Sequence, residues 1–280
     1  MVTNNITKPL RIAESGSPCT ISLFCERIAR MMHGETIGLA EADALVMLHG
    51  WGRDLGALKP LGKLLGPVKH IYLFDLPGFG KSSPPDEVWD SFKYADGVVE
   101  AMRQRGVDRF SVLGHSFGGK VAMSVAVKYP GTVQKLVLMA ASGLKRQRSW
   151  GGWVRMGGVR LLGKGLKGWD RWMGMQLFEE RFVPHFGSRD YRQAKGVMRS
   201  ILVRTISEDF TPHLQGIKAP TLILWGEKDA ETPLEMGVRL HRQILGSKFI
   251  SLPHRDHELF QDSSSHVCAY HIRDFLGAAR

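Results

Sequence analysis

A serine in the middle of the chain stands in a setting that suits a nucleophile. Gly114-His115-Ser116-Phe117-Gly118 has the pattern G-x-S-x-G and lies directly between an apolar run and a helical pattern. A strand that turns so sharply into a helix leaves no room for side chains around the serine, which explains the glycines. The turn lifts the hydroxyl out of the sheet edge. Ser116 is therefore a candidate nucleophile, the alternative being a glycine-rich turn whose serine only caps the helix.

A serine hydroxyl is a weak nucleophile until a base removes its proton, and an acid must then orient that base. Asp229 follows the apolar run PTLILWG, where its carboxylate can face the same sheet edge as Ser116; its alternative role is to form a turn. His257 lies between the last apolar run and the last helical segment, and His254 stands three residues earlier. The residue types and their places thus predict an acid and a base, with two candidates for the base.

The loop His49-Gly50-Trp51-Gly52 follows another apolar run and is rich in glycine. Acyl transfer passes through a tetrahedral intermediate whose oxyanion needs preorganised N–H donors. The backbone N–H groups of Trp51 and Phe117 are the expected donors of this oxyanion hole. We expect the His49 side chain to pack under the loop.

The hydrophobic pattern indicates the elements that must position these residues. Short apolar runs that end in glycine or proline predict strands buried on both faces, and segments of helical length separate them. The expected strands are Ala44–Gly50, His70–Gly78, Arg109–Ser116, Val133–Ala140, Pro220–Gly226 and Lys248–Pro253, and the expected helices are Val88–Arg105, Phe117–Pro130, Pro233–Ile244 and His266–Leu276. This alternation predicts an α/β fold, with a mostly parallel sheet and helices on both faces.

The alternation breaks once, between Gly143 and Pro212, where the chain is helical in parts and rich in Gly, Trp and Arg. We therefore expect a core formed by residues 1–142 and 213–280, with residues 143–212 inserted as a helical cap. The first 40 residues have a weaker pattern, with antiparallel edge strands expected around Ile21–Phe24 and Thr36–Leu39.

Taken together, these motifs resemble the α/β-hydrolase family, in its cap-bearing serine esterase branch. The resemblance extends over Ala44–Leu276 and is carried by LHGWG, FDLPGFGKS, LGHSFGG, PTLILWGEKD and DHELFQD. It implies a catalytic triad of Ser116, Asp229 and His257, in the chain order Ser, Asp, His that this family uses.

The resemblance also separates the two histidines. It favours His257 over His254, because Asp262 stands where the family often has an acid. One position departs from the family pattern: Asp256 precedes His257, where the family usually has glycine.

The charge of the chain is strongly basic and unevenly spread. The formal net charge is +11, and residues 143–212 hold 14 Lys and Arg against 6 Asp and Glu, with four of the seven tryptophans. Tryptophan among basic residues suits a surface that is apolar on one side and anionic on the other. We expect an amphiphilic or anionic substrate, or a transient contact with an anionic membrane or carrier. No nucleic-acid recognition fold is visible, so nucleic acid is not expected.

Other classes of site lack their motifs. GFGKSS has Asp75 where a P-loop needs its first glycine, and GWGRDLG has Leu55 where a dinucleotide loop needs its third. The three cysteines form no C-x-x-C pair, and no metal-binding motif appears, so we expect neither cofactor nor metal. An N-terminus without an apolar signal segment, and the absence of a membrane-length apolar stretch, favour a cytoplasmic location.

These features predict a serine hydrolase that cleaves a carboxylic ester or thioester through an acyl-enzyme on Ser116. Carbon–carbon bond hydrolysis and aminopeptidase-like amide hydrolysis are alternatives on the same triad. A non-catalytic binding protein of the same fold is a further alternative. The presence of all three triad candidates argues against it, because such proteins often lose a triad member. Related dehalogenases and epoxide hydrolases use an Asp nucleophile, so Ser116 argues against both activities.

Overall fold

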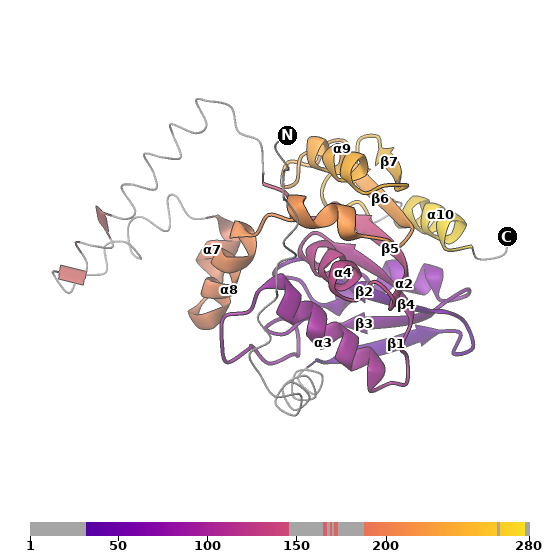
Figure 1. The fold of residues 1–280 in the computed structure, drawn as a ribbon, viewed down its shortest axis with the longest axis horizontal. Coiled ribbons are helices and arrows are strands. Elements are labelled where there is room, and N and C mark those ends of the chain that lie inside the picture. Colours follow the sequence, from indigo (N-terminus) through magenta and orange to yellow (C-terminus); the bar gives the residue numbers. More distant parts are fainter. Residues whose placement is uncertain are drawn as a thin grey trace, which may run out of the picture.

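The computed structural model of this 280-residue chain describes residues 32–145, 165–166, 169, 171–172, 188–261 and 264–277. Within these residues seven strands form one sheet, in the order β1-β3-β2-β4-β5-β6-β7 (Figure 1). The strands are β1 (Gly34–Gly38), β2 (Ala44–Leu48), β3 (His70–Phe74), β4 (Phe110–His115), β5 (Val133–Met139), β6 (Thr221–Gly226) and β7 (Lys248–Leu252). The edge strand β1 runs antiparallel to β3, and every other pair is parallel.

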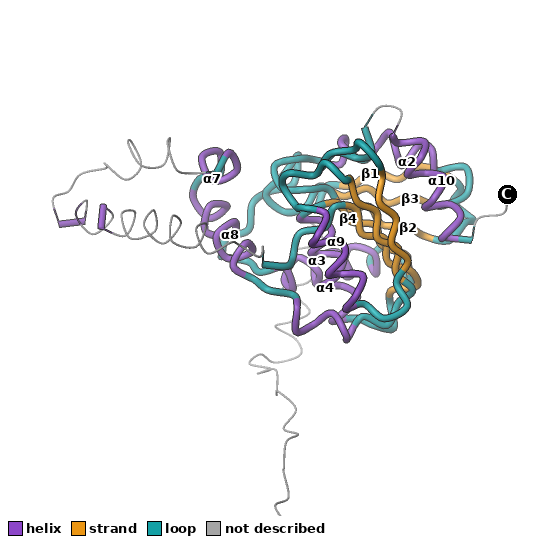
Figure 2. The backbone as a smooth tube through the Cα atoms, turned by 90° about the horizontal axis from the view of Figure 1, so that it is seen from above, coloured by secondary structure: helices purple, strands orange, loops and turns teal. Residues whose placement is uncertain are grey.

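Helices cover both faces of the sheet, as Figure 2 shows from above. One face packs against α3 (Ser91–Arg103), α4 (Phe117–Lys128) and α9 (Leu234–Gln243), and the other against α2 (Lys59–Leu65) and α10 (Ser264–Leu276). All residues of β2, β4 and β6 are buried. Strands enclosed on both sides explain the continuous apolar runs of the sequence, and the α/β class predicted from them is confirmed.

The predicted strands and helices of the core are present, with shifted ends. The helix predicted from Val88 begins at Ser91, because the Asp90 carboxylate accepts a hydrogen bond from Lys93 N–H at 2.9 Å and caps it. Strand β1 matches the edge strand expected near Thr36–Leu39, whereas Ile21–Phe24 lies outside the described residues. The sequence pattern does not predict α2, a seven-residue helix whose first turn holds proline.

The segment between β5 and β6 contributes α7 (Arg189–Gln193), α8 (Gly196–Ser207) and the short 3-10 helix η3 (Thr211–Gly216). Helices α7 and α8 project to one side of the sheet and its covering helices (Figure 2), although Ile201 of α8 is buried in the core cluster. The end of α8 is nevertheless fastened to the core. The buried Lys120 ammonium on α4 donates to the Thr205 carbonyl and lies 3.8 Å from the Glu208 carboxylate, which accepts a hydrogen bond from Ser91 N–H at 3.1 Å.

Burial lowers the pKa of Lys120 to about 8, against the opposing effect of Glu208.

Among the described helices, none combines the length and apolar character that crossing a membrane requires.

Candidate active site

Ser116 forms the single-residue joint between β4 and α4. Its backbone has φ 51° and ψ −113°, a conformation that non-glycine residues rarely adopt and that costs on the order of 1–3 kcal/mol. Hydrogen bonds from Ser116 N–H to the Met139 carbonyl and from Ser142 N–H to the Ser116 carbonyl, each of 3.0 Å, hold this joint to β5. The fold therefore fixes the strained turn that the sequence motif predicts.

The glycines of the motif allow backbone segments to approach closely. A Cβ on Gly114 would lie 2.2 Å from the Gly118 carbonyl oxygen, and a Cβ on Gly118 would lie 2.1 Å from the carbonyl oxygen of Leu48. Both positions are too close for any side chain. The turn that carries Ser116 is thus packed directly against the end of β2.

Asp229 and His257 form a buried pair beside this turn. Asp229 follows β6, His257 follows β7, and the Asp229 Oδ2 to His257 Nδ1 distance is 2.8 Å. The other carboxylate oxygen of Asp229 accepts hydrogen bonds from Glu231 N–H at 2.9 Å and Thr232 N–H at 2.8 Å. The Thr232 hydroxyl donates to Oδ2 at 2.8 Å. Four contacts therefore fix the carboxylate that orients the imidazole.

Charge and burial act in opposite directions on this pair. Burial disfavours the Asp229 carboxylate, but the hydrogen bonds and charge of His257 and the bonds from Thr232 outweigh it, so the pKa of Asp229 is lowered. Burial likewise disfavours the His257 imidazolium, but Asp229, with Glu231 and Glu258, raises the pKa of His257. Asp229 is thus ionised near neutral pH and accepts a hydrogen bond from Nδ1–H of His257, which leaves Nε2 as the basic nitrogen.

Two further residues contact His257. The Glu231 carboxylate lies 3.4 Å from His257 Nε2, and its side chain is 74% exposed. The imidazole of His115, whose Nε2 lies 3.0 Å from the His257 carbonyl oxygen, packs against the His257 ring with centroids 4.8 Å apart. Burial lowers the pKa of His115 to about 3, so this ring stays neutral and donates to the loop that carries His257.

The loop after β2 lies on the other side of Ser116. The Trp51 ring makes edge contacts with Phe79 at 4.8 Å and with Phe117 at 5.3 Å between centroids, which anchors the loop in an aromatic cluster. Within the described part of the chain, neither Trp51 N–H nor Phe117 N–H donates a hydrogen bond. Both expected oxyanion donors are therefore available to a ligand.

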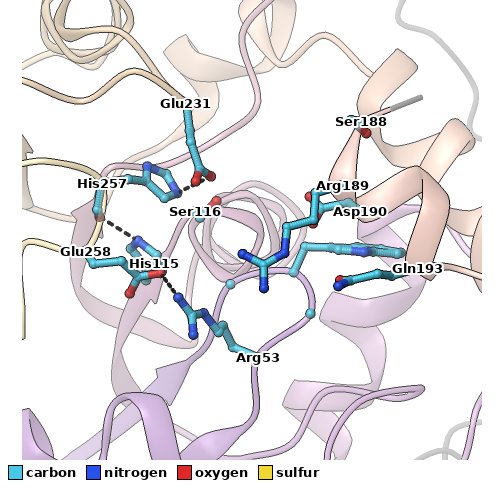
Figure 3. A pocket seen from close by; sticks show the side chains of 13 residues that line it. Arg53, His115, Ser116, Ser188, Arg189, Asp190, Gln193, Glu231, His257 and Glu258 are labelled. Carbon is cyan, nitrogen blue, oxygen red and sulfur yellow. Dashed lines mark hydrogen bonds and ion pairs between the residues drawn. The ribbon is translucent and has the colours of Figure 1, made fainter. Parts of the chain in front are cut away.

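A pocket of about 320 Å³ joins these parts (Figure 3). Its wall includes Ser116, His257, Glu231 and residues 50–53, and α7 with the residue before it adds Ser188, Arg189, Asp190 and Gln193. Arg53 pairs with Glu258 at 2.6 Å, whereas the Arg189 guanidinium points toward the middle of the pocket (Figure 3). The described wall is polar and charged, with Trp51 as its large apolar side chain.

The structure brings Ser116, His257, Asp229 and the 50–53 loop together at one site, as the sequence analysis expects of neighbouring strand ends. His254, the competing base, is exposed, does not line this pocket and has a positive φ of 63°. Asp256, which stands in the place of a family glycine, is not among the described residues with positive φ and needs no glycine.

Sequence reasoning missed Glu231, Arg53, His115 and Arg189. The first three adjoin predicted site residues along the chain, and this proximity was the available signal. Arg189 has no comparable signal, because its place depends on how α7 meets the core.

Comparisons with known proteins agree with this architecture. The chain is 28% identical over 221 residues to a 2-hydroxy-6-oxo-6-phenylhexa-2,4-dienoate hydrolase from Burkholderia cepacia, covering 71% of this chain and 76% of that protein. It is 26% identical over 250 residues to a pimeloyl-[acyl-carrier protein] methyl ester esterase from Nitrosomonas europaea, covering 82% and 93%.

Solved structures show the same fold. An enol-lactonase from Burkholderia xenovorans superposes with a TM-score of 0.66 at 20% identity, covering 88% of this chain and 96% of that one. An esterase from Exiguobacterium antarcticum gives 0.66 at 23%, with the same coverage. A sequence model described as the alpha/beta hydrolase family matches residues 45–269. Because this match extends from β2 into α10 and includes every parallel strand, the chain belongs to the alpha/beta hydrolase family.

Proposed function

We propose that this protein is a serine hydrolase that cleaves a carboxylic ester or thioester through an acyl-enzyme on Ser116. The observation that carries the proposal is the buried Asp229–His257 pair, joined at 2.8 Å, whose histidine lines the same pocket as Ser116, a serine with a strained backbone. An ionised carboxylate at Nδ1 and a basic Nε2 that faces the pocket are what general-base catalysis by histidine requires.

In the first half of this mechanism, His257 Nε2 takes the proton of the Ser116 hydroxyl while Oγ attacks the carbonyl carbon of the substrate. The backbone N–H groups of Trp51 and Phe117 stabilise the oxyanion, and Asp229 stabilises the imidazolium. His257 then gives its proton to the departing alcohol or thiol. In the second half, His257 takes a proton from water while the water oxygen attacks the carbonyl carbon of the acyl-enzyme. The bond from this carbon to Oγ then breaks, and His257 returns the proton to Oγ, which releases the acid and restores the Ser116 hydroxyl.

The charged and polar residues that line the pocket favour a polar, acidic substrate. Arg189 points into it without an ion pair to the described residues, so its guanidinium can receive a carboxylate of the substrate. The relatives named above act on a dienoate and on a pimeloyl ester. We further propose that residues 143–212 form a cap over the core, because α7 supplies Arg189 and its neighbours to the wall opposite His257.

Carbon–carbon bond hydrolysis is a second candidate, favoured by the dienoate hydrolases among the relatives. The same triad would serve it, with a carbon leaving group in place of the alkoxide. A panel that contains p-nitrophenyl esters and vinylogous 1,5-diketones distinguishes the two activities.

The test is Ser116→Ala. It should abolish p-nitrophenyl acetate hydrolysis, by on the order of 10⁶ in kcat, and labelling by a fluorophosphonate probe, while circular dichroism stays unchanged. Ser142→Ala is the matched control and should retain labelling, because it removes a hydroxyl that, among the described residues, donates a hydrogen bond to the Ser116 carbonyl and keeps the Ser142 N–H that holds the same oxygen. Labelling of the Ser116→Ala variant, or absence of labelling in the wild type, would favour another nucleophile or a non-catalytic protein.

A further inference from the structure

His49 lies directly under the loop that carries Trp51, and its imidazole is 1% exposed. It makes two hydrogen bonds within this buried space. Nδ1 lies 2.8 Å from the Gly50 carbonyl oxygen, and the Leu76 backbone N–H reaches Nε2 at 3.0 Å. The histidine therefore bridges the loop after β2 and the loop after β3.

These two bonds determine which nitrogen carries the proton. A backbone N–H can only donate, so Nε2 must be the acceptor and Nδ1 must hold the hydrogen that it gives to Gly50. Burial lowers the pKa of His49, against the opposing effects of the Gly50 bond, Asp75 and Asp54, and this favours the neutral ring that such a pattern needs.

The Gly50 carbonyl belongs to the same peptide group as Trp51 N–H. Because the six atoms of a trans peptide are coplanar, its C=O and N–H point in opposite directions, and fixing one fixes the other. No cis peptide occurs in the described residues. Arg53 N–H also donates to this carbonyl, at 3.2 Å, which closes a turn but leaves the donation by His49 as the stronger constraint on the plane.

We propose that His49 is a positioning residue: its Nδ1–H holds the Gly50 carbonyl, so that Trp51 N–H points toward the oxyanion formed at Ser116. The inference rests on the proposed function and deepens it. The burial of His49 agrees with the expectation that it packs under the loop, and the proposal adds a role to that packing. The edge contact between His49 and Phe79, 5.5 Å between centroids, supports the same orientation through the aromatic cluster.

Two nearly isosteric variants separate the two bonds. In His49→Asn, the side-chain amide nitrogen takes the place of Nδ1 and can still donate to the Gly50 carbonyl. In His49→Gln, the longer side chain places its amide oxygen where Nε2 stands, so that it can still accept from Leu76 N–H. Each variant loses one buried bond, so their thermal midpoints should fall by similar amounts.

Their kinetics should differ. With p-nitrophenyl acetate, His49→Gln should have at least about tenfold lower kcat than His49→Asn at similar KM, because loss of an oxyanion donor costs on the order of 10²–10³ in kcat. Its affinity for a trifluoromethyl ketone, which forms an oxyanion with the serine, should fall by a similar factor. Equal kcat and equal ketone affinity in the two variants would overturn the role of His49.

A measurement on the wild type does not depend on how the variants fold. Imidazole ¹⁵N chemical shifts should show His49 protonated at Nδ1 alone, and the Trp51 amide proton should shift downfield when the ketone binds. Protonation at Nε2, or an unmoved Trp51 amide, would overturn the proposal. If Ser116→Ala retains activity, the proposed function itself is wrong, and this outcome is distinct from equal behaviour of the two His49 variants.

Discussion

At the scale of single residues, Glu231 occupies an unusual place. Its carboxylate lies 3.4 Å from His257 Nε2, the nitrogen that receives the proton of Ser116 in the proposed mechanism. In the free protein it attracts the imidazolium, and a bound substrate must compete with it. Asp229, Glu231 and Glu258 raise the pKa of the imidazole, while the adjacent His115 is neutral. The other charged groups of the pocket wall are Asp190, whose charge also interacts with His257, and Arg53 and Arg189.

Glu231→Gln should move the acidic limb of the kcat/KM profile to lower pH. The reaction needs neutral His257, so the rate falls as the pH drops through the pKa of that residue. Removing one carboxylate that raises this pKa lowers it, and activity then persists at more acidic pH. Glu227→Gln is the control, because Glu227 is exposed on the same loop and bonds to Ser251. If the acidic limbs of the kcat/KM profiles of the Glu231→Gln variant and the wild type coincide, the expectation is wrong.

The two histidines near the last strand should behave differently. His257→Ala should lose activity as severely as Ser116→Ala, on the order of 10⁶ in kcat, since triad members act as a unit. His254→Asn should stay near the wild type, because His254 is exposed and asparagine tolerates its positive φ of 63°. Kinetics with p-nitrophenyl acetate check both variants. A strong loss in His254→Asn with an active His257→Ala would reverse the assignment.

The sequence predicts Ser116 and Asp229 from their places just after apolar strands, whereas His257, five residues after the end of β7, is separated from His254 only by the family resemblance. Glu231 and Arg189 could not be found in the same way. Glu231 reaches His257 only because the turn after Asp229, closed by hydrogen bonds from Glu231 and Thr232, brings its side chain back toward the imidazole. Such a turn depends on backbone angles that no apolar pattern encodes.

At the scale of elements, the approach of α4 to the end of β2 decides whether the site forms. A Cβ on Gly118 would lie 2.1 Å from the Leu48 carbonyl oxygen, one residue before His49. A side chain here must push the helix and the strand apart. The disturbance would reach both candidate oxyanion donors, since Phe117 precedes Gly118 and Trp51 follows the strand.

Gly118→Ala should therefore destabilise the protein by about 1–3 kcal/mol and also lower kcat, because overpacking forces the backbone to shift. Gly131→Ala is a matched control, since no atom lies within 4 Å of a Cβ built there. It should change the free energy of unfolding by no more than about 0.5 kcal/mol. Chemical denaturation measures both variants, and equal stabilities would show that the backbone yields at Gly118 without cost.

The elements themselves were predictable to different degrees. Strands such as β2 and β4 are buried on both faces and therefore leave a continuous apolar run. Helix α2 contains Pro60 and Gly62, which interrupt the helical pattern, and its buried contacts with the sheet outweigh that weakness. The place of β1 beside β3 could not be predicted, because antiparallel pairing at a sheet edge depends on tertiary contacts rather than on local pattern.

At the scale of the whole molecule, the excess of positive charge is concentrated in residues 143–212. Residues 143–212 carry 14 of the 38 basic residues and only 6 of the 27 acidic ones. Two of the tryptophans in this segment, Trp169 and Trp172, are 51% and 76% exposed, with their rings in edge contact at 5.6 Å. We propose that this segment attracts an amphiphilic anionic substrate or carrier, or an anionic membrane surface, before hydrolysis.

This attraction should weaken with salt. When the salt concentration rises from about 0.01 M to about 1 M, the screening length falls from about 30 Å to about 3 Å. For an anionic ester, kcat/KM should fall across this range, whereas a neutral ester of equal chain length should change little. The loss should appear as a higher KM at unchanged kcat, because the segment affects how often enzyme and substrate meet and not the bonds that break.

The variant Arg189→Gln separates binding inside the pocket from attraction at a distance. It should lower kcat/KM for the anionic ester at every salt concentration, while the dependence of kcat/KM on salt stays the same. Flotation with anionic and neutral liposomes distinguishes a membrane from a dissolved carrier. Equal salt responses for both esters, with no preference between the liposomes, would leave these charges without a role in recognition.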